Sequence, residues 1–76
     1  MELEMLQKIV SQVLNVDPRE IKEDTTFIDD LGADSLDLLQ IVMGVEEQFN
    51  IKVSEKDANN INTVGEALAV IRRLAQ

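Results

Sequence analysis

The 76-residue chain contains no histidine and no cysteine, and these absences exclude most familiar catalytic sites. A Ser-His-Asp or Cys-His arrangement needs a side chain that the chain lacks, and the usual zinc sites need cysteine or histidine ligands. No disulfide can form, which suits a reducing compartment. Only three glycines are present, and neither common spacing of a phosphate-binding glycine loop occurs. The chain is therefore unpromising as an enzyme in its own right.

Long apolar runs are also missing. The acidic start, Met1 to Glu4, does not match the basic region of a secretory signal, and no run approaches the roughly 20 residues of a membrane-spanning helix. A chain this short buries only about 60% of its unfolded surface, so its core is small. We expect residues 1–76 to form a single cytoplasmic domain that does not insert into membranes.

Positive charge is absent from the middle third of the chain. Residues 23–47 hold eight acids and no Lys or Arg, whereas the other residues hold seven of each sign, so the net charge of −8 lies in this stretch. Nucleic acid is excluded as a natural partner by this sign, and a basic protein surface is its complement. A role in keeping a small domain soluble would explain the negative sign of this charge but not its clustering in one stretch. Residues 29–37 lack the spacing and the closing Glu of an EF-hand, so no metal site is predicted.

Helical periodicity predicts three longer helices and one short helix. Apolar residues recur at helical spacing over 3–15, over 35–49 and from Val64 towards the end of the chain. The first helix should end before Asp17-Pro18, because the residue before proline is biased away from helical geometry. A cap signal at Ser54 with few apolar residues after it predicts a helix of one or two turns.

Residues 15–34 show no long periodicity, although apolar residues spread through them argue against disorder. Ile21, Phe27, Ile28 and Leu31 are expected to pin this loop onto the helices. Ile51-Lys52-Val53 alternates like a strand but is very short. The predicted fold class is therefore all-α, a small four-helix bundle with a long ordered loop between its first two helices.

Ser35 lies where the polar loop becomes the helix predicted for 35–49. Asp34 is a suitable N-cap, which places the serine hydroxyl at the positive end of a helix. No base stands beside Ser35, but the hydroxyl can still be a substrate for another protein's chemistry. A phosphate esterified to it would lie near free backbone N–H groups, while Asp34 and Asp37 would oppose its charge and turn it outward. By residue type alone, a simple N-terminal helix serine is the stronger interpretation.

The helix over 35–49 presents two apolar surfaces. A broad side is predicted to be the core face, whereas Leu36 and Met43 lie on a narrow strip flanked by Gln40 and Glu47. Two apolar side chains beside an acidic face are typical of a docking patch, although single exposed hydrophobic residues are normal on any surface. The core face consists of Leu38, Leu39, Ile41, Val42, Val45 and Phe49.

Several segments of the sequence form a recognisable pattern. They are Leu31-Gly32-Ala33-Asp34-Ser35-Leu36-Asp37, Val42-Met43, Glu46-Glu47-Gln48-Phe49, the Asp17-Pro18 turn, the loop around Phe27, and Thr63-Val64-Gly65-Glu66-Ala67. This pattern, which extends over nearly the whole chain, closely resembles the free-standing bacterial acyl carrier proteins of fatty acid synthesis. The resemblance implies that Ser35 carries 4′-phosphopantetheine, transferred from coenzyme A by a separate phosphopantetheinyl transferase, and that the thiol of this arm holds acyl intermediates as thioesters.

The resemblance also implies roles for the surrounding residues. It implies a monomer that shuttles acyl groups between fatty acid synthesis enzymes with basic docking patches. The implied partner contacts are Asp34, Leu36, Asp37, Gln40, Met43, Glu46 and Glu47. The implied acyl-chain pocket consists of Phe27, Leu39, Val42, Ile61 and Ala67.

Three departures from the family pattern stand out. Gln40 stands where Glu is common, which weakens one charge contact. Gly44 stands in a helix interior where Ala is usual, at a cost of up to about 1 kcal/mol in helix propensity, and Ser54 replaces a common Pro. Two alternatives remain open: a carrier of the same fold for polyketide, lipid A or other specialised acyl transfer, and an unmodified acidic helical adaptor.

Overall fold

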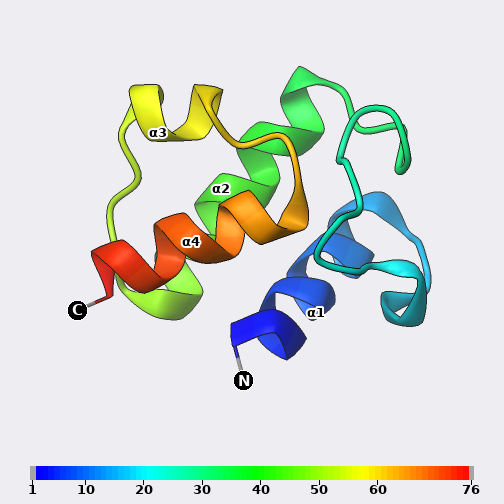
Figure 1. Cartoon of the computed structure of the whole chain (residues 1–76), viewed down its shortest axis with the longest axis horizontal. Coiled ribbons are helices and arrows are strands. Elements are labelled where there is room, and N and C mark those ends of the chain that lie inside the picture. Colours follow the sequence, from blue (N-terminus) through cyan, green and yellow to red (C-terminus); the bar gives the residue numbers. More distant parts are fainter. Residues whose placement is uncertain (1, 76) are drawn as a thin grey trace.

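The computed structural model describes residues 2–75, which fold into three longer helices and one short helix (Figure 1). Helix α1 packs against both α2 and α4. Residues 2–75 contain no strand, and the segment Ile51–Val53, which alternates like a strand in sequence, forms no strand in the structure. The predicted all-α fold class is confirmed. The elements are α1 (Glu2–Leu14), the 3-10 turn η1 (Pro18–Glu20), α2 (Ser35–Phe49), α3 (Glu55–Asn59) and α4 (Val64–Leu74).

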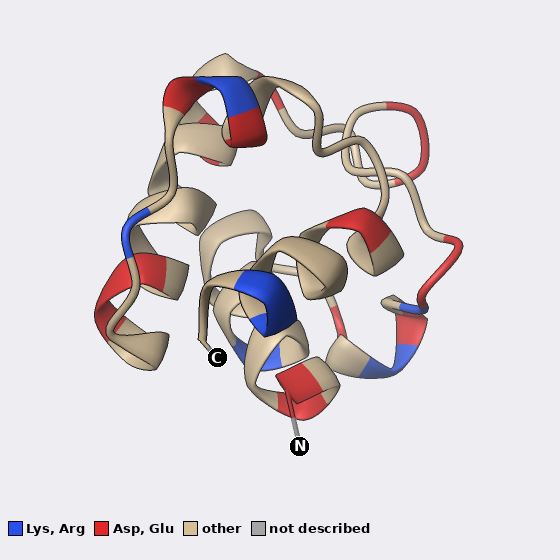
Figure 2. Ribbon diagram, turned by 60° about the vertical axis from the view of Figure 1, so that its left-hand side comes forward, with Lys and Arg blue, Asp and Glu red and all other residues tan. Residues whose placement is uncertain are grey.

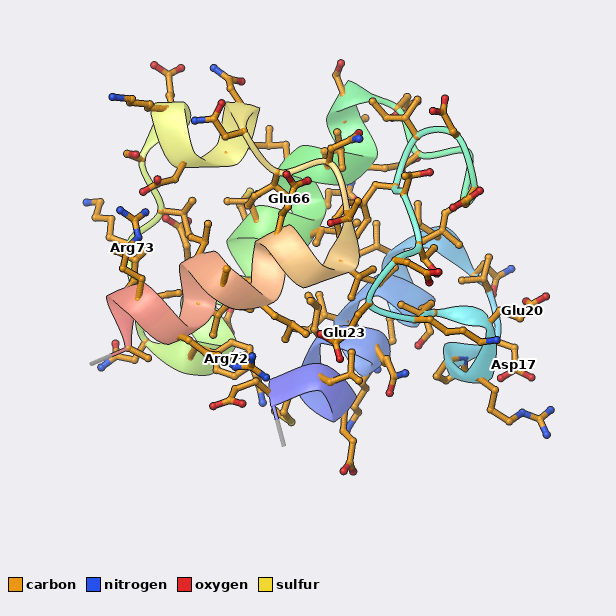
Figure 3. All side chains as sticks on the ribbon, viewed as in Figure 1. Asp17, Glu20, Glu23, Glu66, Arg72 and Arg73 are labelled. Atoms are coloured by element: carbon orange, nitrogen blue, oxygen red, sulfur yellow. The ribbon has the colours of Figure 1, made fainter. Side chains whose placement is uncertain are left out.

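The end of α1 and the turn after it follow from local chemistry. Asn15 adopts a left-handed conformation with φ of 60°, which ends α1 before the proline is reached. Asp17 then caps η1 by accepting a hydrogen bond of 2.9 Å from the backbone N–H of Arg19. The Arg19 side chain bonds the same carboxylate and lowers the pKa of Asp17. Figure 3 shows Asp17 and Glu20 on this turn, at the edge of the molecule.

The long loop between α1 and α2 is ordered, as predicted, and backbone hydrogen bonds join it to the start of α4. The N–H of Val64 donates to the carbonyl of Thr25 at 2.9 Å, and the N–H of Phe27 donates to the carbonyl of Asn62 at 3.1 Å. Phe27 is only 1% exposed and anchors the loop in the core. Ile28, which the sequence predicted to pin the loop as well, is instead 54% exposed.

The first turn of α4 has a partner for each of its free backbone donors. The N–H of Gly65 donates to the Glu23 carbonyl at 2.8 Å, and a Cβ at Gly65 would lie 3.0 Å from that oxygen, so this close approach favours glycine. Thr63 and Glu66 form a capping box. The backbone N–H groups of Thr63 and Asn62, in that order, lower the pKa of Glu66 by donating to its carboxylate. Figure 3 shows Glu23 and Glu66 near this helix start.

The core is built from α1, the long loop, α2 and α4. Within the described part of the chain, α3 contributes no buried residue. The cavity described below lies where α3 faces the other helices. The buried apolar residues are Leu6, Val10, Ile21, Phe27, Ala33, Ile41, Val45, Val64, Ala67, Leu68 and Ile71.

Candidate functional site

Ser35 is the first residue of α2, and its hydroxyl is exposed. Asp34 caps the helix by accepting a hydrogen bond of 2.9 Å from the N–H of Asp37, and the Asp37 carboxylate accepts one of 3.3 Å from the N–H of Asp34. Both acids near Ser35 thus accept hydrogen bonds from backbone N–H groups at the start of α2. Within residues 2–75, no hydrogen bond engages the Ser35 hydroxyl. The structure therefore leaves this hydroxyl available to an external group.

A largely apolar cavity of about 280 Å³ opens beside Ser35. All five residues that the sequence analysis assigned to an acyl-chain pocket line this one cavity, although four separate parts of the chain supply them: the long loop, α2, the segment between α3 and α4, and α4 itself. Ser35 lies at the cavity's edge, so a group attached there would start next to an apolar interior. The lining residues are Phe27, Ser35, Leu38, Leu39, Ile41, Val42, Val45, Val53, Glu55, Ala58, Asn59, Ile61, Ala67, Val70 and Ile71.

Sequence periodicity correctly separated Leu36 and Met43 from the core but misplaced Leu39. Leu36 and Met43 are 62% and 57% exposed, as expected for a surface strip. Leu39, predicted on the core face, is 54% exposed, because the side of α2 that it occupies faces the open cavity. The exposed apolar strip of α2 therefore consists of Leu36, Leu39 and Met43, which lie at helical spacing on one face.

The acids predicted for partner contacts differ in their freedom. The carboxylate of Glu46 is half-buried and accepts a hydrogen bond of 2.8 Å from the backbone N–H of Val53. Glu47 is exposed, and within the described residues no hydrogen bond or ion pair engages it. Gln40 is exposed as well. Figure 2 shows acids but no Lys or Arg on α2, whereas basic residues lie on the other elements. Glu47 is thus the acid of α2 most available to a partner.

Several cavity residues could not be identified as such from sequence. Leu38, Ile41 and Val45 were expected only as core. Val70 does not belong to the apolar stripe that helical spacing gives α4, and this is the sequence signal that it serves another surface. The stripe consists of Val64, Ala67, Leu68, Ile71, Leu74 and Ala75. Among residues 2–75, no group of histidine, cysteine or acidic side chains is placed to hold a metal ion. None of the described helices is long and apolar enough to cross a membrane.

Comparison with known proteins first defines the class. Residues 4–71 match the family described as "Phosphopantetheine attachment site". The chain is 46% identical over 66 residues to an acyl carrier protein of Wolinella succinogenes, with 87% of each chain covered. It is 48% identical over 69 residues to an acyl carrier protein of Caulobacter vibrioides, which covers 91% of this chain and 88% of that protein.

A solved structure agrees with these relatives. The fold matches a Mycobacterium tuberculosis structure described as an acyl carrier protein, with a TM-score of 0.91, 34% identity and coverage of 96% of this chain and 97% of that one. The chain therefore belongs to the acyl carrier protein family, whose members are carriers and not catalysts. As a member of this family, it takes phosphopantetheine as a covalently attached cofactor.

The residues around Ser35 fit such a group. Covalent attachment needs an exposed hydroxyl without a hydrogen-bond partner, and Ser35, whose hydroxyl is engaged by no hydrogen bond among residues 2–75, meets this need. A phosphate there would lie near the N–H groups of the first turn of α2 and the positive end of the helix dipole. The adjacent cavity supplies an apolar environment for whatever the group carries.

Proposed function

We propose that Ser35 is the attachment point of 4′-phosphopantetheine and that the chain carries acyl intermediates between the enzymes of fatty acid synthesis. The observation that carries the proposal is the position of an unengaged serine hydroxyl at the edge of an apolar cavity. When bound, the arm supplies a thiol that holds the acyl group as a thioester.

The chain itself does not catalyse the attachment. The nearest carboxylates, those of Asp34 and Asp37, accept hydrogen bonds from the backbone N–H groups at the start of α2, and no hydrogen bond within residues 2–75 joins either of them to the Ser35 hydroxyl. A separate transferase therefore deprotonates the Ser35 hydroxyl. The serine oxygen then forms a bond to the phosphorus that carries the pantetheine arm of coenzyme A, and the nucleotide portion of coenzyme A leaves as the bond between the two phosphates breaks.

Partner enzymes meet the exposed face of α2. The apolar strip of Leu36, Leu39 and Met43 fits an apolar hollow, and Glu47 beside it attracts a basic rim. The complete contact set that we propose is Asp34, Leu36, Asp37, Gln40, Met43, Glu46 and Glu47. Of these, Asp34, Asp37 and Glu46 also have structural roles, so their substitution affects folding as well as docking.

The cavity shelters the acyl chain. Its lining includes Phe27 of the long loop, Leu39 and Val42 of α2, Ile61 between α3 and α4, and Ala67 of α4. Its volume of about 280 Å³ lies near the lower limit of typical ligand pockets. Short or medium chains are therefore expected to be held inside, with longer chains requiring the walls to move.

The domain 1–76, a monomeric state and the cytoplasm as the compartment stay predictions.

A carrier of the same fold serving polyketide or other specialised acyl transfer is the second candidate. The uncharged Gln40 on the exposed face favours it, because one charge contact of the fatty acid synthesis pattern is missing. The acyl species bound to the protein isolated from its own cells distinguish the two pathways.

Intact-mass measurement tests the proposed attachment. The purified chain is incubated with coenzyme A and a phosphopantetheinyl transferase, in parallel with Ser35→Ala and with the control Ser11→Ala, which changes a serine of α1. The wild type and Ser11→Ala should gain one phosphopantetheine mass, and Ser35→Ala none. No gain on the wild type, or an equal gain on Ser35→Ala, would favour an unmodified acidic adaptor and exclude the proposal.

A further inference from the structure

One wall of the cavity is anchored much less firmly than the others. Helices α2 and α4 line it with closely packed core residues such as Ile41 and Ile71, which are 4% and 1% exposed. Ala58 and Asn59 line it from α3, where no residue is buried. Close-packed cores deform little. The volume of the cavity can therefore change most readily by movement of α3.

Two side chains tie this wall to the rest of the molecule. Arg73, in the last turn of α4, forms an ion pair with Asp57 of α3, and Glu46 of α2 accepts the hydrogen bond from the N–H of Val53 just before α3. The Ser54 cap of α3 bonds only within the segment. Figure 3 shows Arg73 directed towards α3, while its neighbour Arg72 points to the opposite side, near the start of α1.

We propose that the Asp57–Arg73 ion pair is a specificity-determining contact that sets how far α3 stands from α4, and thereby how long an acyl chain the cavity accepts. This inference rests on the proposed function of Ser35 as the attachment point. The pair does not touch the acyl group and acts through the position of Ala58 and Asn59.

The magnitudes suit a contact that an acyl chain can open. The Arg73 side chain is 61% exposed and that of Asp57 is 23% exposed. The ion pair therefore shifts the equilibrium between the closed and open positions of α3 by about fivefold or less. Each methylene that leaves water shifts an equilibrium by about fourfold. One or two further methylenes therefore offset the ion pair, and its removal should extend the accepted chain by about one two-carbon step.

Amide hydrogen exchange on the full chain tests the tether without any attached group. The N–H of Ala58 donates to the Ser54 carbonyl within this wall, so its exchange reports opening of α3. Arg73→Gln should speed this exchange by up to about fivefold, and Arg73→Lys should restore it. Arg72→Gln is the matched control, because Arg72 pairs with Glu2 of α1 and does not line the cavity. Equal exchange in Arg73→Gln and Arg72→Gln would overturn the tether.

A series of acyl chains of increasing length, loaded on each variant and checked by intact mass, tests the effect on chain length. The melting temperature relative to the unacylated form should rise with chain length and then level off. The plateau should come later in Arg73→Gln than in the wild type, Arg73→Lys and Arg72→Gln. If the melting temperatures of all the loaded proteins level off at the same chain length, the inference about the ion pair is overturned and the proposed function of Ser35 stands. If the wild type does not accept the arm, the proposed function is overturned and the effect on acyl-chain length with it.

Discussion

Reversing the charge of Glu47 should weaken partner docking while it strengthens the fold. Glu47 is exposed, is not engaged by other described residues and lies in the last turn of α2, where the helix dipole favours a cation. Glu47→Lys should therefore raise the free energy of unfolding by about 0.3–1 kcal/mol. Against a basic partner, an exposed attraction of about 1 kcal/mol becomes a repulsion of similar size. The resulting loss of about 2 kcal/mol is roughly a 30-fold lower kcat/KM for arm transfer at low salt.

The neighbouring reversal, Glu46→Lys, should have the opposite effect on the fold. It removes the carboxylate that accepts from the N–H of Val53 at 2.8 Å. A hydrogen bond to a charged group contributes about 1.5–3 kcal/mol, which the dipole gain at the helix end only partly offsets. Glu46→Lys should lower stability by about 1–2 kcal/mol, although the formal charge change equals that of Glu47→Lys.

The assay combines melting curves with transfer kinetics at low and high ionic strength. At about 1 M salt the Debye length falls to about 3 Å, so the kinetic defect of Glu47→Lys should largely disappear. Glu4→Lys, an equal charge change at an exposed position of α1, is the control for net charge and should have a much smaller effect on transfer. Transfer by Glu47→Lys at the wild-type rate in low salt, or an equal slowing by Glu4→Lys, would refute the docking argument.

Three further predictions concern the fold that presents the site. The pKa of Glu66 is lowered in the folded protein, so the stability that this carboxylate contributes is present above the ordinary pKa of a glutamate and is lost as the pH falls through the folded pKa. Glu66→Gln should therefore be less stable than the wild type at neutral pH and equally stable in strong acid, and parallel pH–stability curves of the two proteins would contradict this. A Cβ at Gly44 would lie 3.0 Å from the Ile9 side chain, so Gly44→Ala should raise stability by its helix-propensity gain of about 1 kcal/mol only when Ile9 is also replaced by alanine. Additive effects of Gly44→Ala and Ile9→Ala on stability in a double-mutant cycle would exclude the close contact. Phe27→Ala should cost about 3–5 kcal/mol in denaturant unfolding, because the anchor of the long loop is 1% exposed, and a loss below about 1 kcal/mol would show that the loop does not depend on it.

Local sequence signals predicted the helices well because their ends are set by neighbouring residues. Asp34 and Thr63 cap α2 and α4 where the sequence placed those helix starts. Asn15 was not recognised as the residue that ends α1 through a left-handed conformation. The family resemblance, more than the residue physics, pointed to Ser35 as the functional residue.

Long-range contacts were beyond the sequence. The periodicity of α2 marks an apolar face but does not distinguish a closed core from an open cavity, so Leu39 was misplaced. The family resemblance implied a docking role for Glu46, whereas its hydrogen bond to the backbone N–H of Val53 depends on how the following segment returns to α2. At Gly44 the sequence showed only a propensity cost, and the approach of Ile9 explains the absence of a side chain.

The central claim is that a group on Ser35 delivers an acyl chain into the cavity between α2, α3 and α4. The most direct test is NMR of the protein loaded with an isotopically labelled medium-length acyl chain, with nuclear Overhauser contacts recorded from the chain to protein methyl groups. We predict contacts to Val42, Ile61 and Ala67, which line the cavity on three parts of the chain. Contacts confined to the exposed Leu36 and Met43, or no contacts to protein methyl groups, would contradict the account.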